Sequence, residues 1–227
     1  AIMKQSAVLP LKYGKEVWMT EHSVTDNIGA RLPNWHEQLL FAEELNECMQ
    51  AGCTGYIYWY MRAHWAFVGT GEPVDIDGKK YTITGNTKNK LLPRAYVMSH
   101  FSKHLTGSTR LQTKGIASAT NAPYEASAYI KGDSLIVMAI DTTKNTQNLK
   151  LVLPFKVKSG VHLLSTGNET ENLCQEIPIA IDEPVSELTL NWPARSLSTF
   201  IFMIDKGDAA IENVKQTTNG GPKTYYD

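Results

Sequence analysis

One carboxylate in the sequence stands where α/β barrels often place catalytic groups. Residues 15–23 read KEVWMTEHS, and Glu21 follows a loosely alternating apolar run that suits a buried strand of a parallel sheet. Polar residues typical of a loop follow over 22–27. An acid at the carboxyl end of a barrel strand is a candidate catalytic group. On the residues alone, an ordinary strand-end glutamate that faces water is the commoner case, because such patterns recur by chance.

A second candidate segment, further along the chain, is rich in aromatic side chains. Residues 56–65 read YIYWYMRAHW. Tyrosine and tryptophan faces can stack on pyranose rings while their polar edges form hydrogen bonds with hydroxyl groups. Tyr56 and Tyr58 are expected to fill core positions of a strand. The residues at which the strand gives way to a loop, where contact with a ligand is expected instead, are Tyr60, His64 and Trp65.

The two segments read as the strands of one βαβ unit. Between them, Asn34 suits a helix N-cap, and Glu37, three residues later, completes a capping box. Apolar residues then recur at helical spacing until the second strand begins, so strand, helix and strand follow in the order of a parallel sheet. A long polar loop over 66–90 comes next and is expected on the face that carries the strand ends. A closing helix is expected over 94–105.

The segments WMTEHS, GYIYWYMR and LLPRAYVMSHFSKHL together resemble the last part of a family 30 glycoside hydrolase, and above all its bacterial xylanase branch. The resemblance covers nearly the whole chain. It implies the C-terminal part of a (β/α)8 TIM barrel, a retaining endo-β-1,4-xylanase activity, and no cofactor. In this family the glutamate after strand seven, here Glu21, is the catalytic nucleophile. The substrate contacts that we expect are Ser23, Trp59, Tyr60, His64 and Trp65.

The second carboxyl group that a retaining glycosidase needs is not apparent in the sequence. The two groups should lie about 5–5.5 Å apart, and the family supplies the acid/base from an Asn-Glu pair that ends strand four. Asn46-Glu47 falls inside a helix here and Asn168-Glu169 in the β-rich part, so neither is assigned the role. A complete barrel also takes about 250 residues. We therefore expect an N-terminal barrel half, with the acid/base, in a separate chain or another segment of the same enzyme.

The composition changes after Gly107, where short β-patterned runs alternate with turns. Gly132-Asp133 between two apolar runs is a hairpin signal, and strands at this spacing suggest an all-β sandwich, which the family also carries. We thus expect an α/β plus β chain: barrel strands seven and eight over 1–105, a β-sandwich side domain over 106–205, and over 206–227 a linker whose end resembles a sorting segment of secreted Bacteroidetes proteins. The expected runs are 126–131, 135–141, 149–153, 161–165, 188–192 and 198–204.

The composition limits the classes of binding partner that we expect. The formal net charge of −1 over 227 residues gives no reason to expect nucleic acid or an acidic membrane surface. No run approaches the roughly 20 apolar residues of a membrane span. No signal peptide opens the sequence, so under the resemblance the chain starts inside a longer bacterial protein, secreted or at the cell surface or in the periplasm.

Histidine and cysteine spacing points to packing rather than to metal. His100 and His104 are four residues apart, but Phe101 stands where a zinc-protease motif needs glutamate, so packed histidines are favoured. The three cysteines, Cys48, Cys53 and Cys174, form no metal or redox spacing and are expected as buried thiols.

The sequence also bears on the sugar. Glucuronate-dependent members of the xylanase branch resemble WYIRRSY at the aromatic segment, and their second arginine pairs with the glucuronate carboxylate. Ala63 and Trp65 occupy the corresponding positions of that arginine and the final tyrosine, and alanine cannot make a charge-assisted contact. Arg62 points to the other face. We expect xylan hydrolysis without a strict glucuronate requirement. Two alternatives stay open: another family 30 activity (β-glucosidase, β-1,6-glucanase, fucosidase or exo-xylosidase), or a non-catalytic carbohydrate-binding sandwich.

Overall fold

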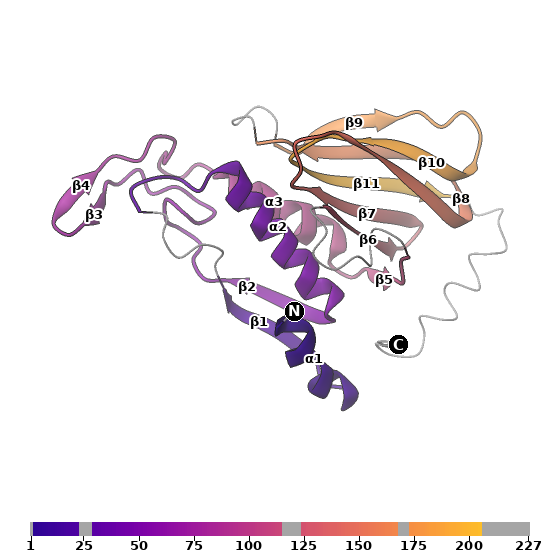
Figure 1. Cartoon of the computed structure of the whole chain (residues 1–227), viewed down its shortest axis with the longest axis horizontal. Coiled ribbons are helices and arrows are strands. Elements are labelled where there is room, and N and C mark those ends of the chain that lie inside the picture. The colour runs from indigo at the N-terminus through magenta and orange to yellow at the C-terminus, as the bar shows by residue number, and fades with distance from the viewer. Residues whose placement is uncertain (1, 23–28, 115–123, 168–172, 206–227) are drawn as a thin grey trace.

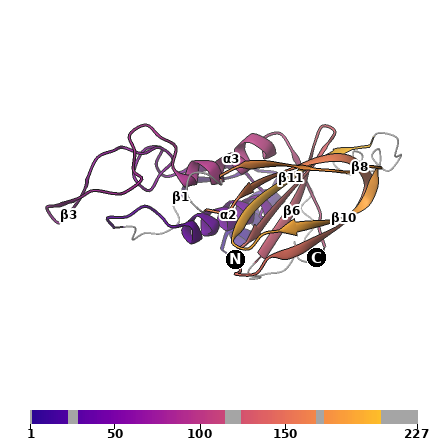
Figure 2. The ribbon, with the colours of Figure 1, turned by 90° about the horizontal axis from the view of Figure 1, so that it is seen from above.

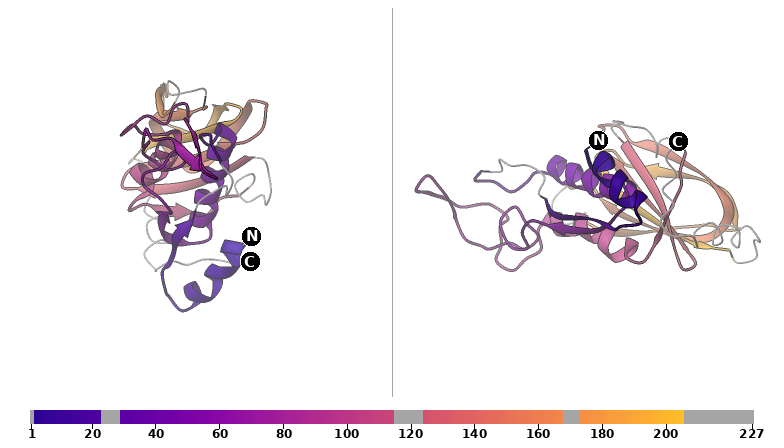
Figure 3. Two further views of the ribbon diagram at one scale, coloured as in Figure 1. Left: turned by 90° about the vertical axis from the view of Figure 1, so that its left-hand side faces the viewer. Right: turned by 90° about the horizontal axis from the view of Figure 1, so that it is seen from below.

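The computed structural model describes residues 2–22, 29–114, 124–167 and 173–205, which form three layers (Figure 1). A pair of parallel strands forms one outer layer, two helices form the middle, and a seven-stranded antiparallel sheet forms the other outer layer (Figures 1 and 3). The first part of the chain supplies α1 (Ile2–Lys12), β1 (Val17–His22), α2 (Trp35–Gln50), β2 (Cys53–Tyr58), β3 (Val74–Ile76), β4 (Lys79–Tyr81) and α3 (Pro93–Leu105).

The predicted βαβ unit is confirmed. β1 and β2 pair in parallel, with His22 opposite Tyr58, and α2 connects them. The predicted capping box starts α2: the Glu37 amide donates to Asn34 Oδ1 at 3.0 Å, and the Asn34 amide donates to Glu37 Oε2 at 2.6 Å. Both contacts satisfy amide groups that the first helical turn leaves without partners.

β1 is not the buried strand that the sequence suggested. Trp18 is 57% exposed, Ile57 on the neighbouring strand is 51% exposed, and Glu21 is exposed as well. The physical reason is the size of this sheet: among the described residues, β1 pairs with β2 alone, and α2 covers one face of the pair. A parallel sheet normally buries both faces, so this pair presents an open edge and an open face.

The seven-stranded sheet comprises the rest of the described chain. Its strands follow the order β10-β8-β11-β7-β6-β5, and β9 pairs with β8. The predicted hairpin at Gly132 is confirmed, because β6 and β7 pair with Lys131 opposite Ser134. The strands are β5 (Thr109–Leu111), β6 (Tyr124–Lys131), β7 (Ser134–Asp141), β8 (Gln147–Ser165), β9 (Gln175–Ile179), β10 (Val185–Trp192) and β11 (Ser196–Ile204).

The prediction of separate strands at 149–153 and 161–165 is wrong, because both runs belong to the 19-residue β8. The first half of β8 pairs with β10, and the second half pairs with β11 and β9. Pro154 directly follows the expected run 149–153 but lies inside β8, where the pairing with β10 shifts register, so its missing N–H interrupts no regular ladder. In the described residues these strands form one sheet curved around its own core, which differs from the separate sheets that a sandwich implies.

Helices α2 and α3 pack between the two sheets. A single apolar cluster joins residues of both helices, Tyr58 of β2, and inward-facing residues of β6, β7 and β11. His100 of α3 is buried at this junction, with Nδ1 2.7 Å from Thr199 Oγ1 and Nε2 2.9 Å from Ser165 Oγ. The prediction of a packed histidine is therefore confirmed for His100. Cys48 and Cys53 are buried thiols as predicted, whereas Cys174 is only partly buried.

No helix within the described ranges combines the length and apolarity that crossing a bilayer takes.

Candidate active site

The carboxyl ends of β1 and β2 lie side by side at one edge of the molecule. The Trp59 amide donates to the His22 carbonyl at 3.0 Å, directly after the last residue pair of the two strands. The loop after β1 and the loop after β2 both start at this edge (Figure 1). The fold therefore brings Glu21 and the start of the aromatic segment 59–65 to the same edge, as the order strand, helix, strand predicts.

Neighbouring residues of β1 face in opposite directions at this edge. Glu21 is exposed, whereas His22 faces α2, where its Nδ1 lies 2.7 Å from Glu44 Oε1. The Tyr56 hydroxyl donates to the same Glu44 oxygen at 2.7 Å. Burial raises the pKa of the Glu44 carboxyl, while the Tyr56 hydrogen bond and the charges of His22 and Arg94 act in the opposite direction. This contact holds the end of β1 against the helix and leaves the Glu21 carboxylate directed away from it.

Three aromatic rings form a continuous surface after β2. The ring centroids of Trp59 and Tyr60 lie 5.7 Å apart, and those of Tyr60 and Trp65 lie 5.2 Å apart with an edge-to-face geometry. Trp59 is 47% exposed and Tyr60 50% exposed. Tyr58, in contrast, is buried as predicted for a core residue. Exposed rings of this kind can stack on sugar rings.

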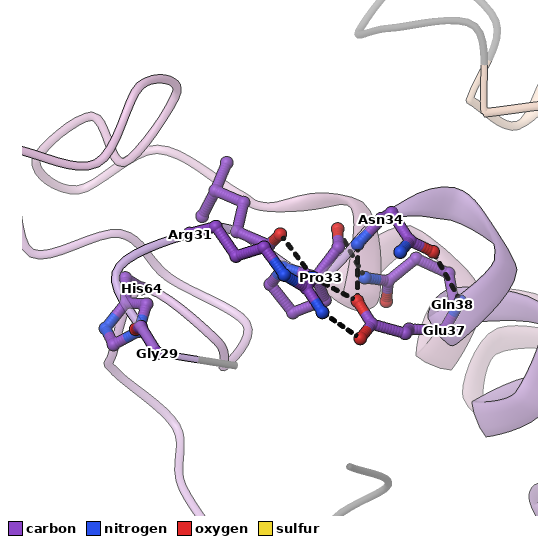
Figure 4. Close-up of polar contacts among 8 residues, drawn as sticks. Gly29, Arg31, Pro33, Asn34, Glu37, Gln38 and His64 are labelled. Atoms are coloured by element: carbon purple, nitrogen blue, oxygen red, sulfur yellow. Dashed lines mark hydrogen bonds and ion pairs between the residues drawn. The ribbon is translucent and has the colours of Figure 1, made fainter. Parts of the chain in front are cut away.

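The other predicted contact residues have different surroundings. His64 is half-buried, and its Nε2 lies 3.2 Å from the Gly29 carbonyl, so it joins the two loops that leave the strands (Figure 4). Burial lowers the pKa of His64, which favours the neutral imidazole. Ser23 lies outside the described residues.

The 66–91 arm is the long loop between β2 and α3, and it projects from the same end of the molecule (Figure 2). Two backbone bonds close its base: Gly69 donates to the Lys90 carbonyl at 2.9 Å, and Asn89 donates to the Gly69 carbonyl at 3.0 Å. The buried Asn86 side chain accepts from the Thr70 amide at 2.9 Å. The base of the arm is thus held by hydrogen bonds, and the β3–β4 hairpin forms its tip. The arm lies on the side of the carboxyl ends of β1 and β2, as the sequence predicts for this loop.

Two arginines near the site escaped the sequence analysis. Arg31 forms a bidentate ion pair with Glu37, at 2.7 and 2.6 Å, which lowers the pKa of that carboxyl (Figure 4). Arg94 is only 1% exposed and donates through Nε to Gln38 Oε1 at 3.0 Å. Its Nη1 donates to the Tyr58 hydroxyl and, at 3.4 Å, to the Trp65 carbonyl. No sequence signal marks Arg94, because an arginine in the first turn of an amphipathic helix normally faces water.

An exposed carboxylate beside stacked aromatic rings can attack an electrophilic carbon of a bound sugar. In the described ranges, no group of three or more His, Cys, Asp or Glu side chains is arranged to hold a metal ion. Glu21 is the single carboxylate that the carboxyl ends of the two described parallel strands supply.

Known proteins that resemble this chain also bear on its function. No protein-family model matches the chain. The glucuronoxylanase XynC of Bacillus subtilis is 27% identical over 194 residues, which cover 83% of this chain and 40% of that enzyme. The chain thus spans about two fifths of the length of the curated relative that it matches.

Solved structures show the same partial overlap. The family 30 endoxylanase of Clostridium papyrosolvens has a TM-score of 0.61 at 22% identity, and the match covers 85% of this chain and 43% of that one. The family 30 subfamily 8 xylanase of Clostridium acetobutylicum has a TM-score of 0.60 at 23% identity, with 86% and 44% covered. The chain is therefore related to the glycoside hydrolase family 30 xylanases, and it corresponds to the C-terminal part of such an enzyme.

Proposed function

We propose that this chain is the C-terminal part of a retaining endo-β-1,4-xylanase and that Glu21 is its nucleophile. The observation that carries the proposal is the exposed Glu21 at the carboxyl end of β1, the edge at which the Trp59 amide donates to the carbonyl of the neighbouring His22. Catalytic groups of α/β barrels lie at that end of their strands. The relationship to xylanases directs the choice of sugar.

In this proposal the aromatic rings hold a xylose unit while Glu21 attacks its anomeric carbon. The carbon–oxygen bond to the leaving sugar breaks, an acid protonates the leaving oxygen, and a glycosyl ester forms on Glu21. The same acid group, now a base, activates a water molecule that hydrolyses the ester and releases Glu21. His22, clamped to Glu44, keeps the Glu21 backbone in place during both steps.

The acid/base is proposed to come from the remainder of the enzyme. The relatives are more than twice as long as the matched segment, and β1 presents an open edge and an exposed Trp18 here. An N-terminal barrel half that pairs with β1 would cover both features. Under this proposal residues 1–105 carry barrel strands seven and eight, 106–205 form the side domain, and 206–227 lead to a sorting segment of a secreted or surface enzyme.

The proposed substrate is xylan with no strict need for glucuronate branches, although the Bacillus relative is named a glucuronoxylanase. Ala63 packs against the apolar core cluster and its amide donates to the Val68 carbonyl at 3.1 Å. A side chain at this position therefore lacks both the charge and the direction to meet the carboxylate of a glucuronate branch. Similar cleavage rates on unbranched xylan and on glucuronoxylan are expected, and activity confined to the branched polymer would contradict this part.

The decisive experiment uses the full-length protein that contains this chain. Reducing-sugar release from linear xylan is compared between wild type, Glu21→Gln and the control Glu16→Gln, which changes an exposed carboxylate just before the same strand. Activity should vanish only in Glu21→Gln, and a 2-fluoro-xyloside should label Glu21 in peptide mass spectra. Full activity of Glu21→Gln would refute the assignment. A wild type that cleaves another β-glycoside but not xylan would favour another family 30 activity.

A further inference from the structure

The guanidinium of Arg94 is buried, and no ion pair joins it directly to a carboxylate among the described residues. It is 1% exposed, and its Nη2 atom has no hydrogen-bond partner there. Its surroundings are the rings of Phe41 and Tyr58, whose centroids lie 5.3 and 5.4 Å from the guanidinium carbon. The charges of Glu37 and Glu44 interact with it without direct contact. Burying a charge that no carboxylate contacts is costly, and an apolar side chain of similar size is often no less stable at such a site. A contribution to the stability of the fold therefore does not by itself explain an arginine at this position.

The polar contacts of Arg94 converge on the base of the aromatic surface. Nη1 donates to the hydroxyl of Tyr58, the last residue of β2, and at 3.4 Å to the carbonyl of Trp65. The Tyr58 hydroxyl in turn donates to the same carbonyl at 3.3 Å. These three contacts join the start of the 59–65 segment to its end, so the segment forms a loop tied at its neck.

Further contacts keep this neck rigid. The Leu92 amide, at the N-cap of α3, donates to the Phe67 carbonyl at 2.9 Å. The Phe67 ring lies 4.8 Å from the Tyr58 ring, measured between centroids. On the other side, Gln38 of α2 receives the Nε–H of Arg94 at 3.0 Å. The guanidinium therefore sits at the point where α2, α3 and the aromatic loop meet.

The exposed rings lie on the loop that this neck closes. Trp59 and Tyr60 follow Tyr58 directly, and the Trp65 carbonyl is itself one of the tied groups. Trp65 is also packed against the apolar core cluster, so the neck contacts are needed to fix the direction of its backbone rather than to hold the ring in place. If the neck opens, Trp65 can change its angle to Tyr60, although no residue that faces a sugar has changed. Ordering side chains on binding costs affinity, and a surface that is already ordered avoids that cost.

We propose that Arg94 is a positioning residue for substrate affinity: through the Tyr58 hydroxyl and the Trp65 carbonyl it holds Trp65 at the angle to Tyr60 that a xylo-oligosaccharide requires. The proposal rests on the proposed function, because the ligand class comes from it. Arg94 touches no substrate and takes part in no bond-making step.

The test is the affinity of the full-length protein for xylohexaose, measured by titration calorimetry in a Glu21→Gln background that cannot turn the sugar over. Arg94→Met should weaken binding by about fivefold, which is the loss expected when about one side chain must be ordered on binding. In the Glu21-intact protein the same change should raise KM by a similar factor and leave kcat within about twofold. Ser99→Ala, on the same helix but bonded to the Tyr96 carbonyl, is the matched control and should bind normally.

Tyr58→Phe gives a second, milder route to the same neck, because it removes only the hydroxyl that joins Arg94 to the Trp65 carbonyl. It should weaken binding in the same direction as Arg94→Met, and the double variant should be no weaker than the worse single one, since both disrupt the same set of contacts at the neck. Arg94→Lys, which keeps one donor, should lie between wild type and Arg94→Met.

The outcomes separate the two proposals. If the Glu21→Gln background protein binds xylohexaose and its Tyr58→Phe variant binds it equally well, the positioning role is refuted and the xylanase proposal is unaffected. The same conclusion follows if Arg94→Met unfolds while Tyr58→Phe binds normally. If the background protein binds cello-oligosaccharide but not xylohexaose, the proposed function fails and this inference fails with it.

Discussion

The Nδ1 atom of His22 lies 2.7 Å from the Oε1 atom of Glu44, and this contact ties the strand that carries Glu21 to the helix behind it. His22 is the neighbour of Glu21 in β1, so its position determines where the Glu21 backbone lies. The Tyr56 hydroxyl donates to the same Glu44 oxygen at 2.7 Å, and β2 is thereby held to the same anchor. Glu44 thus connects both strands of the site without facing the site itself.

Glu44→Gln should lower kcat by about tenfold or more and change KM little, because small displacements of a nucleophile are costly to rate. The amide can still accept the Tyr56 hydrogen bond, but it loses the carboxylate that His22 Nδ1 contacts. Initial rates on linear xylan by the full-length protein measure both constants. His36→Gln, at an exposed position in the first turn of α2, is the control. An unchanged kcat in Glu44→Gln would show that β1 is positioned without this contact.

Glu43 should make the fold less stable in alkaline solution. Burial, and after it the charges of Glu125 and Glu47, raises the pKa of Glu43 to about 7. Because the folded pKa lies above the unfolded value, the folded state binds the proton more tightly, and this stabilisation is complete below about pH 4.5 and lost as the pH rises through 7.

Glu43→Gln should therefore raise the free energy of unfolding at pH 8 by about 1–2 kcal/mol, allowing for solvent screening of a half-buried group, and change it little at pH 4.5. Urea denaturation of the full-length protein at the two pH values measures this. The Asn46 side chain donates to Glu125 Oε2 at 2.7 Å in the same cluster, and this hydrogen bond should remain in the Glu43→Gln variant. Equal effects at both pH values would contradict the assigned pKa.

The buried histidines should make the fold less stable in acidic solution. Burial lowers the pKa of His100 to about 3 and that of His162 to about 4. The folded pKa lies below the unfolded value of about 6.5, so the stabilisation is present above pH 6.5 and is lost as the pH falls toward 4. Imidazole proton shifts measured by NMR should show neither ring titrating above pH 5. A midpoint near 6.5 for His100 would mean that α3 does not seal this junction.

Much of the site can be predicted from local sequence. The parts that cannot be predicted in this way depend on packing between residues that are far apart in the sequence. The capping box at Asn34 and Glu37, and the hairpin at Gly132, are local signals and are confirmed. The placement of Glu21 and Trp59 at the same edge follows from the parallel pairing of β1 and β2, which a βαβ pattern predicts. Arg94 could not be found in this way, because its burial depends on Gln38 and Tyr58, which are distant in sequence.

The two errors in the fold have the same origin. β1 was expected to be buried because its residue pattern suits a covered strand, but burial depends on neighbouring strands and not on the strand's own residues. β8 continues beyond the predicted run 149–153 because the shift in its pairing with β10 accommodates Pro154, although proline usually ends a strand. In both cases the decisive interaction is with another strand.

The close approach of Gly160 to Phe202 offers a test of the curved sheet. Gly160 lies in the second half of β8, opposite Phe202 of β11, and a Cβ atom at Gly160 would lie 2.6 Å from the Phe202 ring. Gly160→Ala should lower the free energy of unfolding by about 1–3 kcal/mol, the usual cost of overpacking a dense core. Urea denaturation of the full-length protein measures the change, with the neighbouring exposed Ser159→Ala as the control. A Gly160→Ala protein as stable as wild type would show that β8 and β11 do not pack as closely as the ring contact requires.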